Sequence, residues 1–146
     1  MKKILIRNGR IEIVKDRIYT VSQYQRSVYG EKVIKRKDTF LRSWEPKKSK
    51  MAAAIGNGLK KLPIGEDTET LYLGASSGTT VSHISDLSPE GKIFAIEVAP
   101  EPFAKLLDLS EERNNIYPVL ESARLPEKYD FFLGHSPDII YQDISQ

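Results

Sequence analysis

Apolar and polar residues alternate along the first 45 residues with the period of two that is typical of β-strands. Lys15 and Asp16 separate the first two alternating segments, and this spacing predicts a tight hairpin. We therefore expect a small, basic β domain over residues 1–45. Its predicted strands lie in the segments RIEIV, RIYTVS, KVIKRK and TFLRSW.

The pattern changes near Pro46, where a second domain, residues 46–146, is expected to begin. Proline disfavours helix in the residue before it, and Ser49 can cap a helix that follows. The segment SKMAAAIGNGLKKL then predicts a helix that Gly56 and Gly58 weaken. Its expected buried face consists of Met51, Ala54, Ile55 and Leu59.

From Thr70 onward, short apolar runs alternate with helical patterns. Helices are predicted over residues 79–87 and from Pro100 to about Arg113, with a short helical turn between the last two strands. Strands that alternate with helices indicate a parallel sheet in an α/β domain. The predicted strands are TLYLG, KIFAIEV, IYPVLE and DIIYQD.

Composition narrows the possible chemistry. The chain is 40% hydrophobic and 29% charged, which is typical of a globular protein. It contains no cysteine and only two histidines, which argues against disulfides, iron–sulfur clusters, thiol nucleophiles and a metal site. No apolar run approaches the roughly 18–20 residues of a membrane span. The apolar run near the N-terminus contains too few residues for a signal peptide. We expect no membrane partner and a cytoplasmic location.

Charge is divided unevenly along the chain. Residues 1–61 contain 17 Lys and Arg against 5 Asp and Glu, whereas residues 62–146 contain 5 against 15. A one-sided positive field attracts polyanions such as nucleic acid. The alternative is that the two halves largely neutralise each other.

Small residues follow the first strand of the parallel sheet, from Gly74 through Ala75 to Thr80. Ligands in such sheets bind beyond the carboxyl ends of the strands. This loop lacks the lysine of a phosphate-binding P-loop and the glycine spacing of a dinucleotide site. A phosphate ligand is therefore disfavoured, and a nicotinamide-dependent oxidoreductase is only a weak alternative.

Glu97 ends the next strand, where a carboxylate can accept hydrogen bonds from both hydroxyls of a ribose. A ligand with an adenosyl group but no phosphate points to S-adenosylmethionine. Its amino-acid end could meet the loop backbone, the helix N-terminus and the hydroxyls of Thr79 and Thr80. The alternative for Glu97 is an exposed acid at a strand end.

The resemblance to a known family is carried by five segments: WEPKKSKMAAAIGNGL, LYLGASSGTTVSHISDL, GKIFAIEVAPE, EERNNIYPVLESARLPEKY and DIIYQDISQ. Together they resemble the fibrillarin family, and more specifically its archaeal rRNA/tRNA 2′-O-methyltransferases. The resemblance implies an α/β S-adenosylmethionine-dependent methyltransferase fold with a Rossmann-like parallel sheet. It implies ribose 2′-hydroxyls of pre-rRNA and tRNA as acceptors, box C/D guide RNA, a Nop-type scaffold protein and a kink-turn-binding ribosomal-type protein. Eukaryotic members are nucleolar.

The resemblance also implies site residues. Lys50 and Asp143 fall on the first two members of the family's Lys-Asp-Lys-His catalytic set. Without the resemblance, Lys50 would be read as one more solvated lysine. The cofactor contacts expected from the strand ends and from the resemblance are Gly74, Ala75, Thr79, Thr80, Glu97, Val98, Ser122, Ala123, Asp143 and Gln146.

Two positions depart from the family pattern. Ser122 stands where the family usually has an aspartate that contacts the adenine, and Val98 stands where an aromatic residue usually packs on the ring. Serine keeps a hydrogen-bonding group but loses the charge, so we expect weaker cofactor binding.

Length is the larger departure, because the sequence stops after the fourth strand of a fold that normally has seven. We expect the sheet to be truncated there, with strand 139–141 as an apolar open edge, and this chain alone to be poorly active. The alternative function is that of a non-catalytic module that binds RNA or the scaffold protein of the same particle.

Overall fold

The computed structural model describes residues 3–144. The chain divides into two compact units, Met1–Gly65 and Glu66–Gln146. The division lies later in the chain than the expected boundary after residue 45, because the first unit also contains a helix and the loop that follows it. Within this unit, the Asn8 side chain donates to the carbonyl of Ile64 over 2.8 Å and holds the end of that loop.

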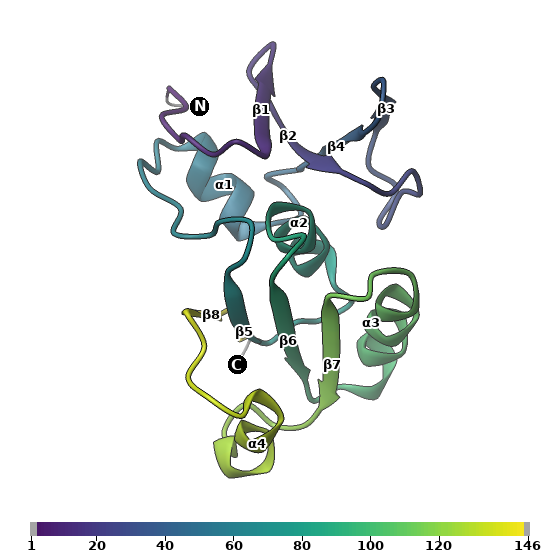
Figure 1. Ribbon diagram of the computed structural model, residues 1–146, viewed down its shortest axis with the longest axis vertical. Helices are drawn as coiled ribbons and strands as arrows, with labels where there is room; N and C mark the ends of the chain where they lie inside the picture. The colour runs from purple at the N-terminus through teal and green to yellow at the C-terminus, as the bar shows by residue number, and fades with distance from the viewer. Residues whose placement is uncertain (1–2, 145–146) are drawn as a thin grey trace. The chain divides into compact units, whose positions relative to one another are not determined.

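The first unit contains an antiparallel sheet with the strand order β1-β2-β4-β3 (Figure 1). β1 and β2 confirm the predicted hairpin, since Lys15 and Asp16 have φ of 52° and 62°. Two successive positive φ values match the right-handed twist of the flanking strands. The strands are β1 Ile11–Val14, β2 Arg17–Ser22, β3 Val33–Lys35 and β4 Phe40–Ser43.

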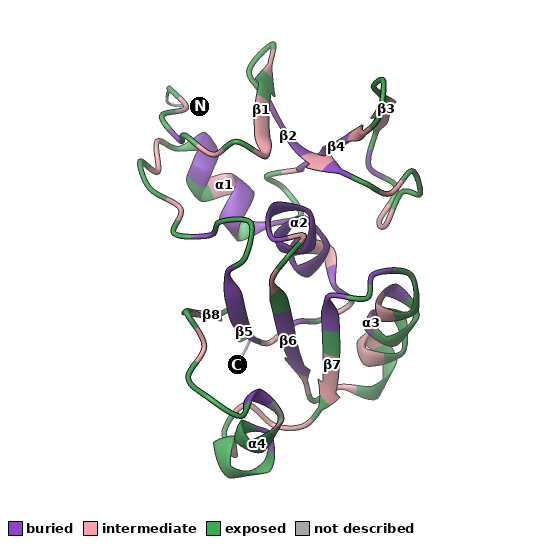
Figure 2. Cartoon of the chain, in the orientation of Figure 1, coloured by how far each residue is buried: buried purple, intermediate pink, exposed green. Residues whose placement is uncertain are grey.

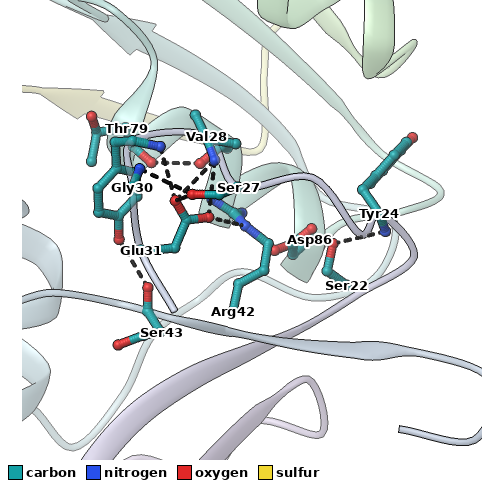
Figure 3. Close-up of polar contacts among 12 residues, drawn as sticks. Ser22, Tyr24, Ser27, Val28, Gly30, Glu31, Arg42, Ser43, Thr79 and Asp86 are labelled. Carbon is teal, nitrogen blue, oxygen red and sulfur yellow. Dashed lines mark hydrogen bonds and ion pairs between the residues drawn. The ribbon is translucent and has the colours of Figure 1, made fainter. Parts of the chain in front are cut away.

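A buried ion pair holds the loop between β2 and β3. Arg42 donates from Nε to the Glu31 carboxylate over 2.8 Å, and both side chains are buried. The Ser27 hydroxyl and the amides of Val28 and Tyr29 also donate to this carboxylate. Figure 3 shows Ser27, Val28 and Arg42 converging on Glu31. A buried charge needs a partner and hydrogen bonds of this kind, so the network fixes the course of the loop.

Helix α1, Lys50–Gly56, follows β4 in the same unit. As predicted, Ser49 caps it by accepting from the amide of Ala52. The Ser49 hydroxyl also accepts from the indole N–H of buried Trp44 over 2.9 Å, which ties the cap to the end of β4. The expectation of a buried Ala54 is wrong. The helix ends at Gly56, and within these two turns its buried residues are Met51, Ala52, Ile55 and Gly56.

The second unit contains a parallel sheet with the strand order β7-β6-β5-β8 (Figure 1). Consecutive strands are joined through helices, as the alternating pattern predicted. The strands are β5 Glu69–Leu73, β6 Lys92–Glu97, β7 Ile116–Leu120 and β8 Ile139–Gln142. The connecting elements are α2 Thr79–Leu87, α3 Pro100–Glu112, η1 Pro126–Lys128 and α4 Asp130–Leu133.

Burial within this unit is greatest in the central strands and in α2 (Figure 2). Tyr129 and Leu133 pack against Leu71, Phe94 and Ile96 of the sheet. β8 pairs with β5 and, among residues 3–144, with no other strand. The Ile140 side chain on this strand is 63% exposed, so β8 is the apolar open edge that the sequence predicted.

Candidate functional site

The loop after β5 is shaped by glycines at both ends. Gly74 and Gly78 have φ of 88° and 97°, in the left-handed region that favours glycine. The amides of Gly74 and Ala75 both donate to the carbonyl of Ile96, over 3.0 and 2.9 Å. The loop therefore turns across the end of β6 and brings its backbone to the carboxyl edge of the sheet.

Glu97 ends β6 and holds this loop. Its Oε1 accepts from the amide of Ser76 over 2.7 Å, and its Oε2 accepts from the amide of Ala99 over 2.9 Å. Ser76 has φ of 53°, which is uncommon for a residue with a side chain. A carboxylate has about four acceptor sites, so Glu97 can still accept hydrogen bonds from a ligand.

A hollow of about 500 Å³ lies beside Glu97 at the carboxyl ends of the strands. It joins residues from four strand ends that are far apart in sequence. Among residues 3–144, Arg124 is the only Lys or Arg that lines it. Ser76, within the predicted glycine loop, also lines the hollow, as do Pro102 in the first turn of α3 and Arg124 after β7, which were not predicted. The predicted residues that line the hollow are Gly74, Glu97, Val98, Ser122, Ala123 and Asp143.

Asp143 follows β8, directly beside the glycine loop. Its amide donates to the carbonyl of Leu73 over 2.9 Å. A Cβ added at Gly74 would lie 2.3 Å from the backbone oxygen of Asp143, which no real structure permits. The glycine therefore allows the two strand ends to approach and places Asp143 at the wall of the hollow.

The N-terminus of α2 carries the two predicted threonines. Gly78 is the N-cap, and no side chain caps this end of the helix. Thr79 is half-buried and Thr80 is buried, and neither lines the hollow; Ala75 is also buried outside it. A Cβ at Gly78 would lie 2.6 Å from a methyl carbon of Leu109, so this glycine also lets α2 and α3 pack closely.

Buried Tyr72 on β5 is a residue that the sequence analysis missed. Its ring contacts that of Tyr141 on β8, with 4.9 Å between the two ring centroids. Burial raises the pKa of Tyr72 above its ordinary value. A signal was present in the sequence, because Tyr72 and Tyr141 each lie two residues before a strand-end site residue.

The remaining predicted site residues are placed as follows. Val98 is 63% exposed at the rim of the hollow. Lys50 is exposed and begins α1 in the first unit, whereas Asp143 belongs to the second. Gln146 lies outside the described residues. The assignment of Lys50 and Asp143 to catalysis therefore stays a prediction.

No helix among residues 3–144 has both the length and the apolarity of a membrane span.

Comparison with known sequences identifies relatives over nearly the whole chain. A family model described as Fibrillarin matches residues 7–146. A fibrillarin-like rRNA/tRNA 2′-O-methyltransferase from Thermoplasma acidophilum is 57% identical over 131 residues. This match covers 90% of the chain but 56% of the relative, so the chain spans about half the length of such relatives.

Comparison with solved structures confirms the predicted fold class. The chain matches Aeropyrum pernix fibrillarin in complex with natively bound S-adenosyl-L-methionine with a TM-score of 0.84 and 40% identity, over 93% of this chain and 61% of that one. A fibrillarin/Nop5p complex matches with a TM-score of 0.84 and 46% identity, over 99% and 65% of the two chains. Both relatives share the α/β architecture that the alternating strands and helices indicated.

Proposed function

This chain belongs to the fibrillarin family, and from this premise we propose that it binds S-adenosylmethionine and takes part in RNA 2′-O-methylation. The acceptors would be ribose 2′-hydroxyls of pre-rRNA and tRNA, selected by a box C/D guide RNA. The observation that carries the proposal is the hollow that joins Gly74, Glu97, Ser122 and Asp143. The hollow contains carboxylates and a hydroxyl, and its glycine loop contains no lysine. These groups suit a ligand that has hydroxyls and an amine but no phosphate.

The residues present fit this cofactor. Glu97 has acceptor sites left for ribose hydroxyls after its two bonds to backbone amides. Ser122 can hydrogen-bond a base, and the carboxylates of the hollow favour the cofactor's cationic centres over an anionic ligand. The uncapped start of α2 provides amides for its carboxylate.

When bound, S-adenosylmethionine would supply an electrophilic methyl group for transfer from its sulfur to the ribose 2′-oxygen. Holding the two reacting atoms in line contributes much of the rate. Asp143 either orients the 2′-hydroxyl or accepts its proton, and Lys50 stabilises the negative charge that develops on the oxygen. These two roles rest on the family resemblance.

The proposed partners follow from the same family. The fibrillarin/Nop5p complex among the structural neighbours supports a Nop-type scaffold protein. Box C/D guide RNA and a kink-turn-binding protein follow from the resemblance in the sequence, as does a cytoplasmic location for an archaeal-type member.

Calorimetric titration of the purified chain with S-adenosylmethionine tests the cofactor assignment. We expect saturable binding that Glu97→Gln weakens, with Glu101→Gln as a control at an exposed position in the first turn of α3. Binding of NADH in place of S-adenosylmethionine would contradict the assignment. Guide-dependent methylation by the particle assembled with this chain tests the activity. We expect the isolated chain to be poorly active, and robust methylation by it alone would contradict that expectation.

A second candidate function is favoured by the charge distribution. The excess of Lys and Arg in residues 1–61 suits a module that binds RNA or the scaffold protein without catalysis. Such a module would bind RNA with a strong dependence on salt and would bind no S-adenosylmethionine. The titration therefore separates the two candidates.

A further inference from the structure

The hollow at the carboxyl ends of the strands is acidic, and one cation lies at its rim. Glu97, Glu121 and Asp143 line it together with Arg124, an exposed residue in the loop after β7. Among residues 3–144, the guanidinium of Arg124 forms no ion pair and no hydrogen bond. Its five N–H donors are therefore available to a ligand that carries negative charge.

The backbone that carries Arg124 is held in place. The Arg124 amide donates to Oγ of Ser122 over 3.2 Å, and the amide of Leu125 donates to the Ser122 carbonyl over 3.1 Å. The hydroxyl of buried Tyr129 donates to the carbonyl of Ala123 over 2.9 Å and ties this turn to the core. The side chain of Arg124 therefore starts from a fixed point, and a ligand that it binds does not have to order the loop.

The other cations of the second unit lie elsewhere. Residues 62–146 contain 5 Lys and Arg against 15 Asp and Glu. Arg113 is buried in an ion pair, and Lys92 lies over a tyrosine ring. Lys105 and Lys128 are exposed on α3 and η1, and none of these four lines the hollow. An RNA phosphate that approaches the hollow is repelled by its carboxylates, and within the described part of this unit Arg124 is the lining residue that attracts it.

Two anions of the proposed reaction could bind this guanidinium, the carboxylate of the cofactor and a phosphate of the acceptor RNA. The cofactor's carboxylate is proposed to bind at the start of α2, after β5, whereas Arg124 follows β7. In the sheet, β6 separates these two strands, so their ends lie roughly 10 Å apart at the usual strand spacing. The position of Arg124 therefore favours the phosphate, whose oxygens a guanidinium can bind with two parallel hydrogen bonds.

We propose that Arg124 is a substrate-binding residue that donates to a backbone phosphate of the acceptor RNA at the rim of the hollow. The proposal rests on the proposed function. A phosphate contact fixes the position of the strand and carries no sequence information, which suits an enzyme whose target is selected by a guide RNA. The contact is made equally before and during methyl transfer, so it lowers the KM for RNA without changing kcat.

Arg124→Gln removes the charge and keeps a polar side chain. Lys128→Gln is the matched control, because it removes the same charge from an exposed position four residues later, outside the hollow. Fluorescence anisotropy of a labelled single-stranded RNA, titrated with the full chain and S-adenosylmethionine at several salt concentrations, measures RNA binding. Calorimetry measures cofactor affinity, and methylation by the assembled particle measures kcat and the KM for RNA.

We expect Arg124→Gln to weaken RNA binding about fivefold at low salt and to raise the KM for RNA by a similar factor, with kcat unchanged. The slope of log affinity against log salt should fall by about 0.7, the value for one phosphate contact to a single strand. Affinity for S-adenosylmethionine should stay within about twofold of wild type, since the cofactor does not contact this residue. Arg124→Lys should recover the salt slope and part of the affinity, because it keeps the charge but loses the paired hydrogen bonds.

Three outcomes would overturn the assignment. If Arg124→Gln binds RNA as Lys128→Gln does, and both bind the cofactor normally, Arg124 is a solvated charge and the proposed function stands. If Arg124→Gln loses cofactor affinity and keeps RNA affinity, the guanidinium binds the cofactor's carboxylate instead. If the wild-type chain binds no S-adenosylmethionine, the proposed function fails, and the role of Arg124 in it fails as well.

Discussion

One glutamate in each unit holds a neighbouring loop in place. The two differ in how many of their hydrogen-bond acceptor sites are occupied. Glu31 and Glu97 each hold an adjacent loop by accepting hydrogen bonds from backbone amides. Glu31 also accepts from Ser27 and pairs with Arg42, so its acceptor sites are fully used. Glu97 accepts from two amides, and among residues 3–144 no Lys or Arg pairs with it.

This difference determines whether the carboxylate only stabilises the fold or can also bind a ligand. A buried carboxylate with every acceptor site occupied can only stabilise the fold, because nothing remains for a ligand. A carboxylate that is half satisfied, at the edge of a hollow, holds its loop and still offers acceptors. The comparison predicts that changes at Glu31 alter unfolding and leave cofactor affinity intact, whereas changes at Glu97 alter affinity.

Glu31→Ala should have the largest effect. It removes the carboxylate from a buried ion pair with Arg42, and breaking a buried pair by removing one member costs about 3–5 kcal/mol. Urea unfolding measures the loss. Glu12→Ala is the control, because Glu12 pairs with Arg36 at an exposed position, where the cost is about 0–1 kcal/mol. Equal losses in the two variants would remove the basis of the comparison.

Lowering the pH should reduce the free energy of unfolding of the first unit by a part of the loss expected for Glu31→Ala. Burial alone would raise the pKa of Glu31, but the Arg42 charge and the hydrogen bonds from Tyr29 and Ser27 outweigh it and hold the pKa below its ordinary 4.5. A lowered pKa gives stability that is complete above pH 4.5 and is lost as pH falls through the folded value. The midpoint of urea unfolding, measured between about pH 3 and 7, tests this pH dependence. The Glu31→Ala variant should lack the part of the pH dependence that comes from Glu31.

Glu97→Gln should weaken S-adenosylmethionine binding by about 10- to 100-fold, since a hydrogen bond to a charged group contributes about 1.5–3 kcal/mol. The amide can accept through one oxygen only, so one of the two loop amides also loses its partner. Calorimetry gives the affinity. The Glu31→Ala variant, where it remains folded, is the control that should lose stability but keep its affinity. An affinity unchanged in Glu97→Gln would place the ribose elsewhere.

Ser122→Asp should have the smallest effect and the opposite sign. Ser122 lines the hollow, and a carboxylate there would accept a charge-assisted hydrogen bond from the adenine amino group. We expect cofactor affinity to rise about threefold to tenfold, with Ser110→Asp on the exposed side of α3 as the control. Unchanged affinity by calorimetry would count against the adenine assignment.

Local signals predicted the fold well. The hairpin at Lys15 and Asp16, the Ser49 cap and the alternation after Thr70 each depend on neighbours in sequence, which is why pattern alone located them. Strand ends also predicted which residues would meet, since parallel strands place their carboxyl ends on one edge. Gly74, Glu97, Ser122 and Asp143 line one hollow for that reason.

Contacts between distant side chains could not be predicted in this way. The Glu31–Arg42 pair depends on how a loop folds back on β4, and the ring contact between Tyr72 and Tyr141 depends on the pairing of β5 with β8. Met51 and Ile55 are buried as expected, but Ala54 is not, since burial in α1 is set by what packs on its two short turns. Lys50 and Asp143 were connected by family resemblance, and no spacing rule joins them.

The open edge of β8 also has a practical consequence. Among residues 3–144 β8 pairs only with β5, so its other edge, beside the exposed Ile140, can serve as a template on which another chain adds a strand. Purified at high concentration, this chain should self-associate through that edge, and the binding experiments above should be run dilute. Ile140→Lys, a charge placed on the edge strand, would give a better-behaved sample without touching the hollow.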